Sequence, residues 1–230
     1  YPSENVSMMP AILTTVETTA LALLLAVPLG LFTAVYLNEY AKRGNKLVNV
    51  IRITTETLSG IPSIVFGLFG YLMFNISFGW GFSMMAGVIT LEMMILPLII
   101  RTTEEALLAV PDSYREGSFG LGAGKMRTVF RVILPTAVPG IMSGVILSIG
   151  RIVGESAALI FTSGSGHSIP GSLVGSGSSA ATLTVHMYIL SNEGLHVNEA
   201  FASAVVLLAL TFLINLVSDL IERRIAKKKG

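Results

Sequence analysis

Two charged residues, Arg151 and Glu155, lie four positions apart inside an otherwise apolar stretch. In a helix, this spacing places both side chains on one face. A guanidinium at the centre of a membrane costs about 2.5–3.5 kcal/mol on insertion scales, so such charges usually face a cavity or a partner. Two interpretations stay open. The two residues neutralise each other as an intrahelical ion pair, or Arg151 lines a path for an anion and Glu155 holds or tunes it.

The planar fork of a guanidinium can bond two oxygens of an oxyanion at once, which favours the anion path. Arg101 is a weaker candidate of the same kind, at the end of another apolar stretch. It is either an anchor that extends to the membrane interface or a contact at an inner gate or exit. Glu155 and Arg101 are therefore grouped with Arg151 as candidate substrate-path residues.

A polar segment, 101–137, contains a second pattern with local helical signals. Ser113 and Glu116 have the spacing of a capping box, which predicts a short helix from 114 to 121. Glycines follow at alternate positions, and a second helix over 125–134 is expected to end at Pro135. Two short helices at a glycine elbow suit a rigid knob for a soluble partner. The alternative is a loop that merely connects two spans.

The composition of the 230 residues indicates a membrane protein. Hydrophobic residues make up 52% and charged residues 13%, against about 25% charged residues in typical soluble domains. Mean hydropathy is +0.74. A net charge of +1 gives no sign of nucleic-acid binding, and the lack of cysteine excludes a disulfide scaffold, a cysteine zinc site and a cysteine nucleophile. The three histidines are scattered, so no metal site is expected.

Five apolar stretches have, or approach, the roughly 20 residues that a helix needs to cross a bilayer. They cover residues 12–37, 61–78, 82–100, 138–161 and 200–221. The second and third are separated by only three residues around Trp80, which predicts a tight helical hairpin. We therefore expect an all-α integral membrane bundle with five transmembrane helices, forming a single transmembrane domain over residues 1–230.

Basic residues are distributed to one side of these spans. Apart from Arg151, every Lys and Arg lies in segment 38–60, in segment 101–137 or in the tail after 221, whereas 1–11, 79–81 and 162–199 contain none. The positive-inside rule makes the basic side cytoplasmic, so the C-terminus is expected inside and the N-terminus outside. Because the chain begins with Tyr1 and lacks a cleavable signal, we expect one more transmembrane helix before it.

The cytoplasmic segment resembles the signature of the ABC importer permeases (MetI-like), in which E-A-A is followed by three residues, Gly, nine residues and I-x-L-P. Here Glu116-Gly117-Ser118 precede Gly122, and Val132-Ile133-Leu134-Pro135 follow at that spacing. In that family this loop is the coupling helix that fits a groove of the ATP-binding subunit. The resemblance implies that role for a set of residues here: Ser113, Tyr114, Arg115, Glu116, Gly117, Ser118, Gly122, Leu134 and Pro135.

Longer stretches are similar to the PstA family of phosphate permeases, among them SGIPSIVFGLFGY at 59–71 and GRIVGESAALIFT at 150–162. The resemblance implies phosphate import through the bacterial inner membrane, by alternating access, with Arg151 and Glu155 in the path. The implied partners are an ATPase dimer (PstB-like), a second permease (PstC-like), an external phosphate-binding protein (PstS-like) and membrane lipid. No cofactor and no catalytic residue are expected in this chain, because its GLGAGKM departs from a P-loop and ATP would bind the partner.

Two other functions stay open. The cargo could be another oxyanion, such as sulfate, molybdate or phosphonate, because one arginine does not separate them. The chain could instead be a membrane scaffold or sensor of phosphate status, although a scaffold has no need for charges in mid-membrane. The Gly/Ser-rich segment 163–179 is either a flexible external loop, a docking surface for the binding protein, or a loop that folds into the pathway.

Overall fold

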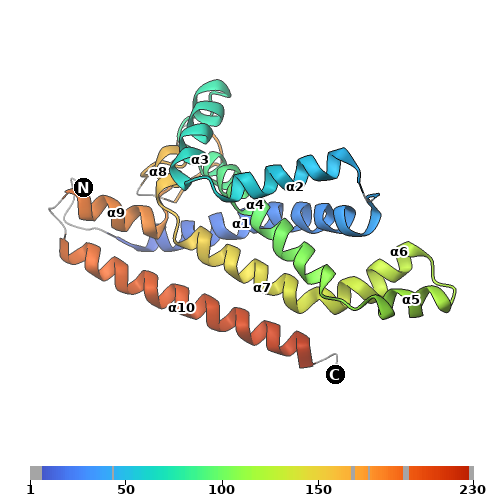
Figure 1. The fold of residues 1–230 in the computed structure, drawn as a ribbon. Coiled ribbons are helices and arrows are strands. Elements are labelled where there is room, and N and C mark those ends of the chain that lie inside the picture. The colour runs from blue at the N-terminus through green and yellow to red at the C-terminus, as the bar shows by residue number, and fades with distance from the viewer. Residues whose placement is uncertain (1–6, 43, 167–168, 176, 194–196, 228–230) are drawn as a thin grey trace. The chain divides into compact units, whose positions relative to one another are not determined.

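The computed structural model describes residues 7–42, 44–166, 169–175, 177–193 and 197–227, and within these ranges all regular structure is helical (Figure 1). Four helical stretches among the described residues are long and apolar enough to cross a membrane. They are Met9–Tyr40, Met84–Leu108, Lys125–Val153 and Val197–Ser218. A fifth span results if the bent pair Lys46–Ser59 and Ser63–Ser77 is counted as one. The apolar stretches read from the sequence therefore correspond to helices, with changed boundaries.

The chain forms two compact units, each built from separate stretches of sequence. The first unit contains Tyr1–Leu25, Ile61–Ile95 and Ile149–Leu216, and the second contains Ala26–Gly60, Leu96–Ser148 and Val217–Gly230. The long helices α1 (Met9–Val35), α4 (Met84–Leu108), α7 (Leu134–Val153) and α10 (Val197–Lys227) each contribute to both.

Close backbone contact between α3 (Ser63–Gly70) and α8 (Ala157–Thr162) organises the first unit (Figure 1). A Cβ atom at Gly67 would lie 2.8 Å from the Cα of Ala158, so only glycine allows this approach. The π-helical segment η2 (Tyr71–Ser77) continues α3, and the Nδ2 of Asn75 donates to the carbonyl of Thr162 at 3.1 Å. Beyond η2, the ring of Trp80 stacks on Phe74 with centroids 5.6 Å apart, within the short connection that the sequence predicts.

The Gly/Ser-rich segment is folded into the first unit, so the flexible-loop interpretation is wrong for its described residues. Ser163 and Ser178 are buried. The amide of Ala180 donates to the carbonyl of Ser163 at 3.1 Å, and the amide of Met84 donates to the carbonyl of Ser178 at 2.9 Å. Backbone hydrogen bonds of this kind satisfy groups that would be costly to bury alone. The helix α9 (Leu183–Glu193) follows this segment.

An apolar core fills the second unit. It joins the end of α1, the π-helical segment η1 (Tyr36–Tyr40), the C-terminal half of α4 and the start of α7. Leu37, Leu107 and Ile133 are among its buried residues. The amphipathic helix α2 (Lys46–Ser59) is capped by the side chain of Asn45, which accepts from the amide of Leu47 at 3.0 Å.

The fourth predicted span, 138–161, is wrong at both ends. Helix α6 (Lys125–Thr128), the π-helical segment η3 (Val129–Ile133) and α7 form one helical stretch, so Pro135 does not end a helix. The wider turn of η3 lies directly before Pro135, where a proline would otherwise interrupt the hydrogen-bond ladder. At the other end, α7 stops at Val153 and α8 starts at Ala157.

Candidate functional site

Glu155 lies in the break between α7 and α8, which removes the premise that it shares a helix face with Arg151. Glu155 is 8% exposed, and its Oε1 accepts from the amide of Ala158 at 3.0 Å. The carboxylate therefore satisfies a free N–H in the first turn of α8, as a capping side chain does. At the other end of the break, the hydroxyl of Thr184 donates to the carbonyl of Val153, the last residue of α7, at 2.5 Å.

Arg151 lies in the last turn of α7 and is half-buried. Among the described residues no hydrogen bond or ion pair joins it to Glu155, so the interpretation as an intrahelical pair is wrong. A basic residue in the last turn of a helix is stabilised by the helix dipole. The guanidinium is therefore available to an anion, and its role in a substrate path stays a prediction.

Arg101 lies on α4 with its side chain exposed. Its Nε forms an ion pair with the Oε1 of Glu105 at 3.0 Å, and both side chains are 63% exposed. Exposed pairs of this type contribute at most about 1 kcal/mol. Arg101 belongs to the second unit and Arg151 to the first.

The predicted coupling loop is a helical elbow, made of α5 (Asp112–Gly120) and α6 (Figure 1). Gly122 forms the turn with φ of 80°, a conformation that glycine adopts without strain. The hydroxyls of Ser118 and Thr128 lie 2.8 Å apart and tie the two helices together. The expected capping box is wrong, because α5 begins at Asp112 after Pro111 and no side chain caps it. Proline fixes the backbone at this position and so replaces the capping signal.

Most residues assigned to coupling by resemblance lie on the exposed surface of this elbow. Ser113, Tyr114, Glu116, Gly117 and Gly122 are exposed, and Ser118 is half-buried. Leu134 and Pro135 differ, because both are half-buried in the continuing helix and Leu134 packs against the core of the second unit.

Large apolar side chains are exposed around the same elbow. Tyr114 is 50% exposed, Phe119 48%, Leu121 91% and Met126 70%. Apolar surface gathered in this way marks a contact with another protein or with lipid. The elbow thus combines a rigid frame with an apolar surface, as the docking interpretation requires.

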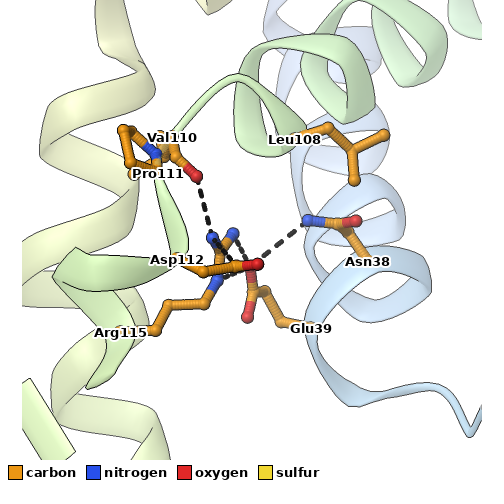
Figure 2. Close-up of a pocket in the computed structure, with 7 residues that line it drawn as sticks. All are labelled: Asn38, Glu39, Leu108, Val110, Pro111, Asp112 and Arg115. Carbon is orange, nitrogen blue, oxygen red and sulfur yellow. Dashed lines mark hydrogen bonds and ion pairs between the residues drawn. The ribbon is translucent and has the colours of Figure 1, made fainter.

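Arg115 also differs from the exposed coupling residues, because its guanidinium points toward Glu39 (Figure 2). Its Nη2 forms an ion pair with the Oε1 of Glu39 at 2.7 Å, and the two side chains are only 17% and 9% exposed. Its Nη1 donates to the Oδ1 of Asp112 at 3.1 Å. The hydrogen bond to Glu39 raises the pKa of Arg115 above its ordinary value, although burial acts in the opposite direction. These residues border a cavity of about 460 Å³.

Sequence reasoning missed two residues of η1 that contact the elbow. Glu39 was not considered, and the Nζ of Lys125 lies 5.3 Å from the centre of the Tyr40 ring, a cation–π contact. The available signal was a lone carboxylate at the end of a long apolar helix.

A second cavity, of about 600 Å³, lies in the first unit beside the break at Glu155. Apolar side chains of α3 and α8 form most of its wall, with Tyr71, Ser156 and Tyr188 as polar members. No group of three or more His, Asp or Glu residues that could hold a metal was found among the described residues. His167 and His196 lie outside the described residues.

Known proteins are similar to this chain in sequence and in fold. The family described as "Binding-protein-dependent transport system inner membrane component" matches residues 26–229. The chain is 43% identical over 144 residues to the probable ABC transporter permease protein YqgI of Bacillus subtilis (strain 168), which covers 63% of this chain and 49% of the relative. It is 36% identical over 201 residues to the phosphate transport system permease protein PstA 1 of Mycobacterium tuberculosis (strain CDC 1551 / Oshkosh), covering 87% and 66%.

The chain therefore spans between about half and two thirds of the length of these two relatives. Among solved structures, an inward-facing form of the MetNI methionine ABC transporter superposes with a TM-score of 0.72 at 21% identity, covering 94% of this chain and 93% of that one. At this identity the likeness establishes the fold.

Proposed function

Because the chain belongs to the family of binding-protein-dependent transport system inner membrane components, we propose that it is a membrane permease subunit of an ATP-driven importer of inorganic phosphate. The observation that carries this proposal is the rigid elbow of α5 and α6 with its exposed apolar side chains. A permease that does not bind ATP needs such a surface to receive movement from an ATPase subunit. The cargo is supported by the similarity to a phosphate permease over 87% of the chain.

Arg151 supports an anionic cargo, because its guanidinium is half-buried in an apolar helix and is joined to no carboxylate among the described residues. An isolated buried charge is costly, so its retention favours a role with a ligand. Alternating access follows for an importer of this kind: an external binding protein (PstS-like) delivers phosphate, and an ATPase dimer (PstB-like) moves the elbow. A second permease (PstC-like) completes the path, and the basic segments and C-terminus face the cytoplasm.

The test uses the full-length chain, assembled with its partner subunits in proteoliposomes that contain ATP. In Arg151→Ala, labelled phosphate uptake should fall to the background level while the complex still co-purifies. Arg151→Lys should give intermediate uptake, since it keeps the charge and loses the planar fork. Uptake by Arg151→Ala near that of the unmodified complex would contradict a role for Arg151 in the path.

Competition identifies the cargo in the same vesicles. An excess of unlabelled phosphate should suppress labelled uptake, and sulfate, molybdate or phosphonate should not. Suppression by one of those anions would assign the permease to that anion instead. A scaffold or sensor predicts no uptake by the unmodified complex at all.

A further inference from the structure

The π-helical segment η1 contacts both halves of the coupling elbow. Glu39 pairs with Arg115 of α5 at 2.7 Å, and Tyr40 lies under Lys125 at the start of α6, 5.3 Å from its Nζ. These two contacts come from adjacent residues of η1 and reach opposite sides of the turn at Gly122. The segment η1, which continues α1, therefore contacts the elbow at two points.

Arg115 also joins a third segment, the end of α4. Its Nη1 donates to the carbonyl of Val110 at 3.0 Å (Figure 2). Its Nη2 donates to the carbonyl of Leu107 at 3.1 Å. The carbonyl of Leu107 belongs to the last turn of α4 and also accepts from the amide of Val110 at 3.4 Å, whereas the carbonyl of Val110 lies in the connection after the helix. One side chain thus links η1, the C-terminal end of α4 and α5, and its low exposure strengthens each hydrogen bond.

The local geometry of η1 sets the position of Glu39. The amide of Ala41 donates to the carbonyl of Tyr36 at 2.8 Å, an i→i+5 bond that widens the last turn of the helix. Segments of this kind are uncommon and are frequent at functional sites. The connection from α4 to α5 is only three residues long, between Leu108 and Asp112, and it holds the buried Val110. Without Glu39, the elbow would stay joined to α4 by this connection and to α7 through α6 and η3, but it would lose its ion pair with η1.

We propose that Glu39 is a positioning residue that couples the elbow to α1, so that a displacement of α5 by an ATPase subunit is passed to η1. The inference rests on the proposed function. It assigns Arg115 a role inside the permease, whereas the resemblance placed it at the ATPase contact.

The experiment compares Glu39→Gln and Arg115→Gln with the unmodified full-length complex in proteoliposomes. Phosphate uptake, ATP hydrolysis and co-purification of the ATPase subunit are measured on each preparation. Both variants should transport about tenfold less phosphate per ATP hydrolysed, the factor expected for loss of one charge-assisted hydrogen bond. The ATPase subunit should still co-purify with each, because the apolar surface of the elbow is unchanged.

Asp112→Asn is the matched control, since Asp112 bonds the same guanidinium but is 86% exposed. Its ratio of phosphate to ATP should stay within about twofold of the unmodified complex, as for other exposed pairs. A variant that damaged only the fold would lower hydrolysis and co-purification together and leave this ratio unchanged. That result for Glu39→Gln would overturn the inference.

A covalent link tests the connection independently of charge. The 230 residues contain no cysteine, so Glu39→Cys with Arg115→Cys provides the only thiols among them. The uncrosslinked double variant should show the low ratio, and a short bifunctional maleimide should restore most of it. Failure of the crosslink to restore the ratio would contradict the inference. Absence of phosphate uptake by the unmodified complex would instead contradict the proposed function.

Discussion

Two buried glutamates, one in each compact unit, have different partners. Glu39 in the second unit pairs with the guanidinium of Arg115 at 2.7 Å, with its side chain 9% exposed. Glu155 in the first unit is 8% exposed and accepts a single hydrogen bond from the amide of Ala158 at 3.0 Å. The first environment requires a negative charge, whereas the second requires only an acceptor oxygen.

The same difference extends to the surroundings of each residue. The second unit contains the ion pairs between Arg52 and Glu104, between Arg101 and Glu105, and around Arg115. In the described part of the first unit, hydroxyl groups, backbone amides and closely packed glycines take that place, as at Thr184 and Gly67. Substitutions that remove charge should therefore affect the second unit most, and substitutions that change volume or capping should affect the first.

The largest effect is expected for Glu39→Ala. Removing Glu39 leaves Arg115 charged, with only the exposed Asp112 as a carboxylate partner, which should lower the free energy of unfolding by about 3 kcal/mol. Asp112→Ala removes an 86% exposed partner of the same arginine and should cost less than about 1 kcal/mol. Thermal unfolding of the purified full-length chain in detergent compares the two, and equal losses would remove the distinction between them.

In the first unit, Gly67→Ala should destabilise by about 2 kcal/mol, since the new methyl group meets the backbone of Ala158 at 2.8 Å and that backbone cannot easily move. Gly150→Ala is the matched change, because a Cβ there meets nothing within 4 Å. In a helix, alanine is favoured over glycine by up to about 1 kcal/mol, so this variant should be neutral or more stable. The same melting measurement checks both.

Glu155 separates the loss of an acceptor from the loss of a charge. Glu155→Gln keeps an oxygen that can accept from Ala158 and should melt close to the unmodified chain, whereas Glu155→Ala should lose about 1 kcal/mol, as for a lost helix cap. If Glu155→Gln were as damaging as Glu155→Ala, the carboxylate charge would matter here as it does at Glu39. Uptake measured beside stability would show whether that charge acts in transport.

The smallest effect concerns alkaline pH. The raised pKa of Arg115 means that its contribution to stability is complete below the unfolded-state pKa and is lost only as pH rises through the higher folded-state pKa. The ordinary pKa of an arginine already lies well above this range, so this contribution should stay constant between about pH 7 and pH 10. Arg115→Lys introduces a group with an ordinary pKa of about 10.4 and should lose stability, relative to the unmodified chain, toward that pH. Melting temperatures of the two chains that differ by the same amount at every pH would contradict this prediction.

The membrane helices could be predicted well from the sequence, because a long apolar helix is stable in few environments other than a bilayer. The errors concern local hydrogen bonding. The break after Val153 depends on how Glu155 and Thr184 satisfy backbone groups, and hydropathy does not report such contacts. The continuation of the helix through Pro135 depends on a π-helical turn that has no simple sequence signature.

Long-range pairing accounts for the other omission. Glu39 and Arg115 lie 76 positions apart, so no local pattern joins them. The resemblance correctly selected the elbow as a distinct part of the chain, but it could not tell which side chains face outward. That assignment needed the carbonyls of Leu107 and Val110, which only the folded chain places beside the guanidinium.

The bond between Met84 and Ser178 has a consequence for the order of folding during synthesis. The amides of Met84 and Met85, the first residues of α4, donate to the carbonyls of Ser178 and Leu173, and the amide of Ser83 just before the helix donates to the carbonyl of Thr162. All three acceptors are translated long after α4 itself. Until those residues leave the ribosome, the amides at the start of α4 lack these hydrogen-bond acceptors. Closing contacts so distant in the chain is slow. The N-terminal end of α4 should therefore reach its final packing late, and a nascent chain arrested before Ser178 should leave Met84 open to chemical labelling.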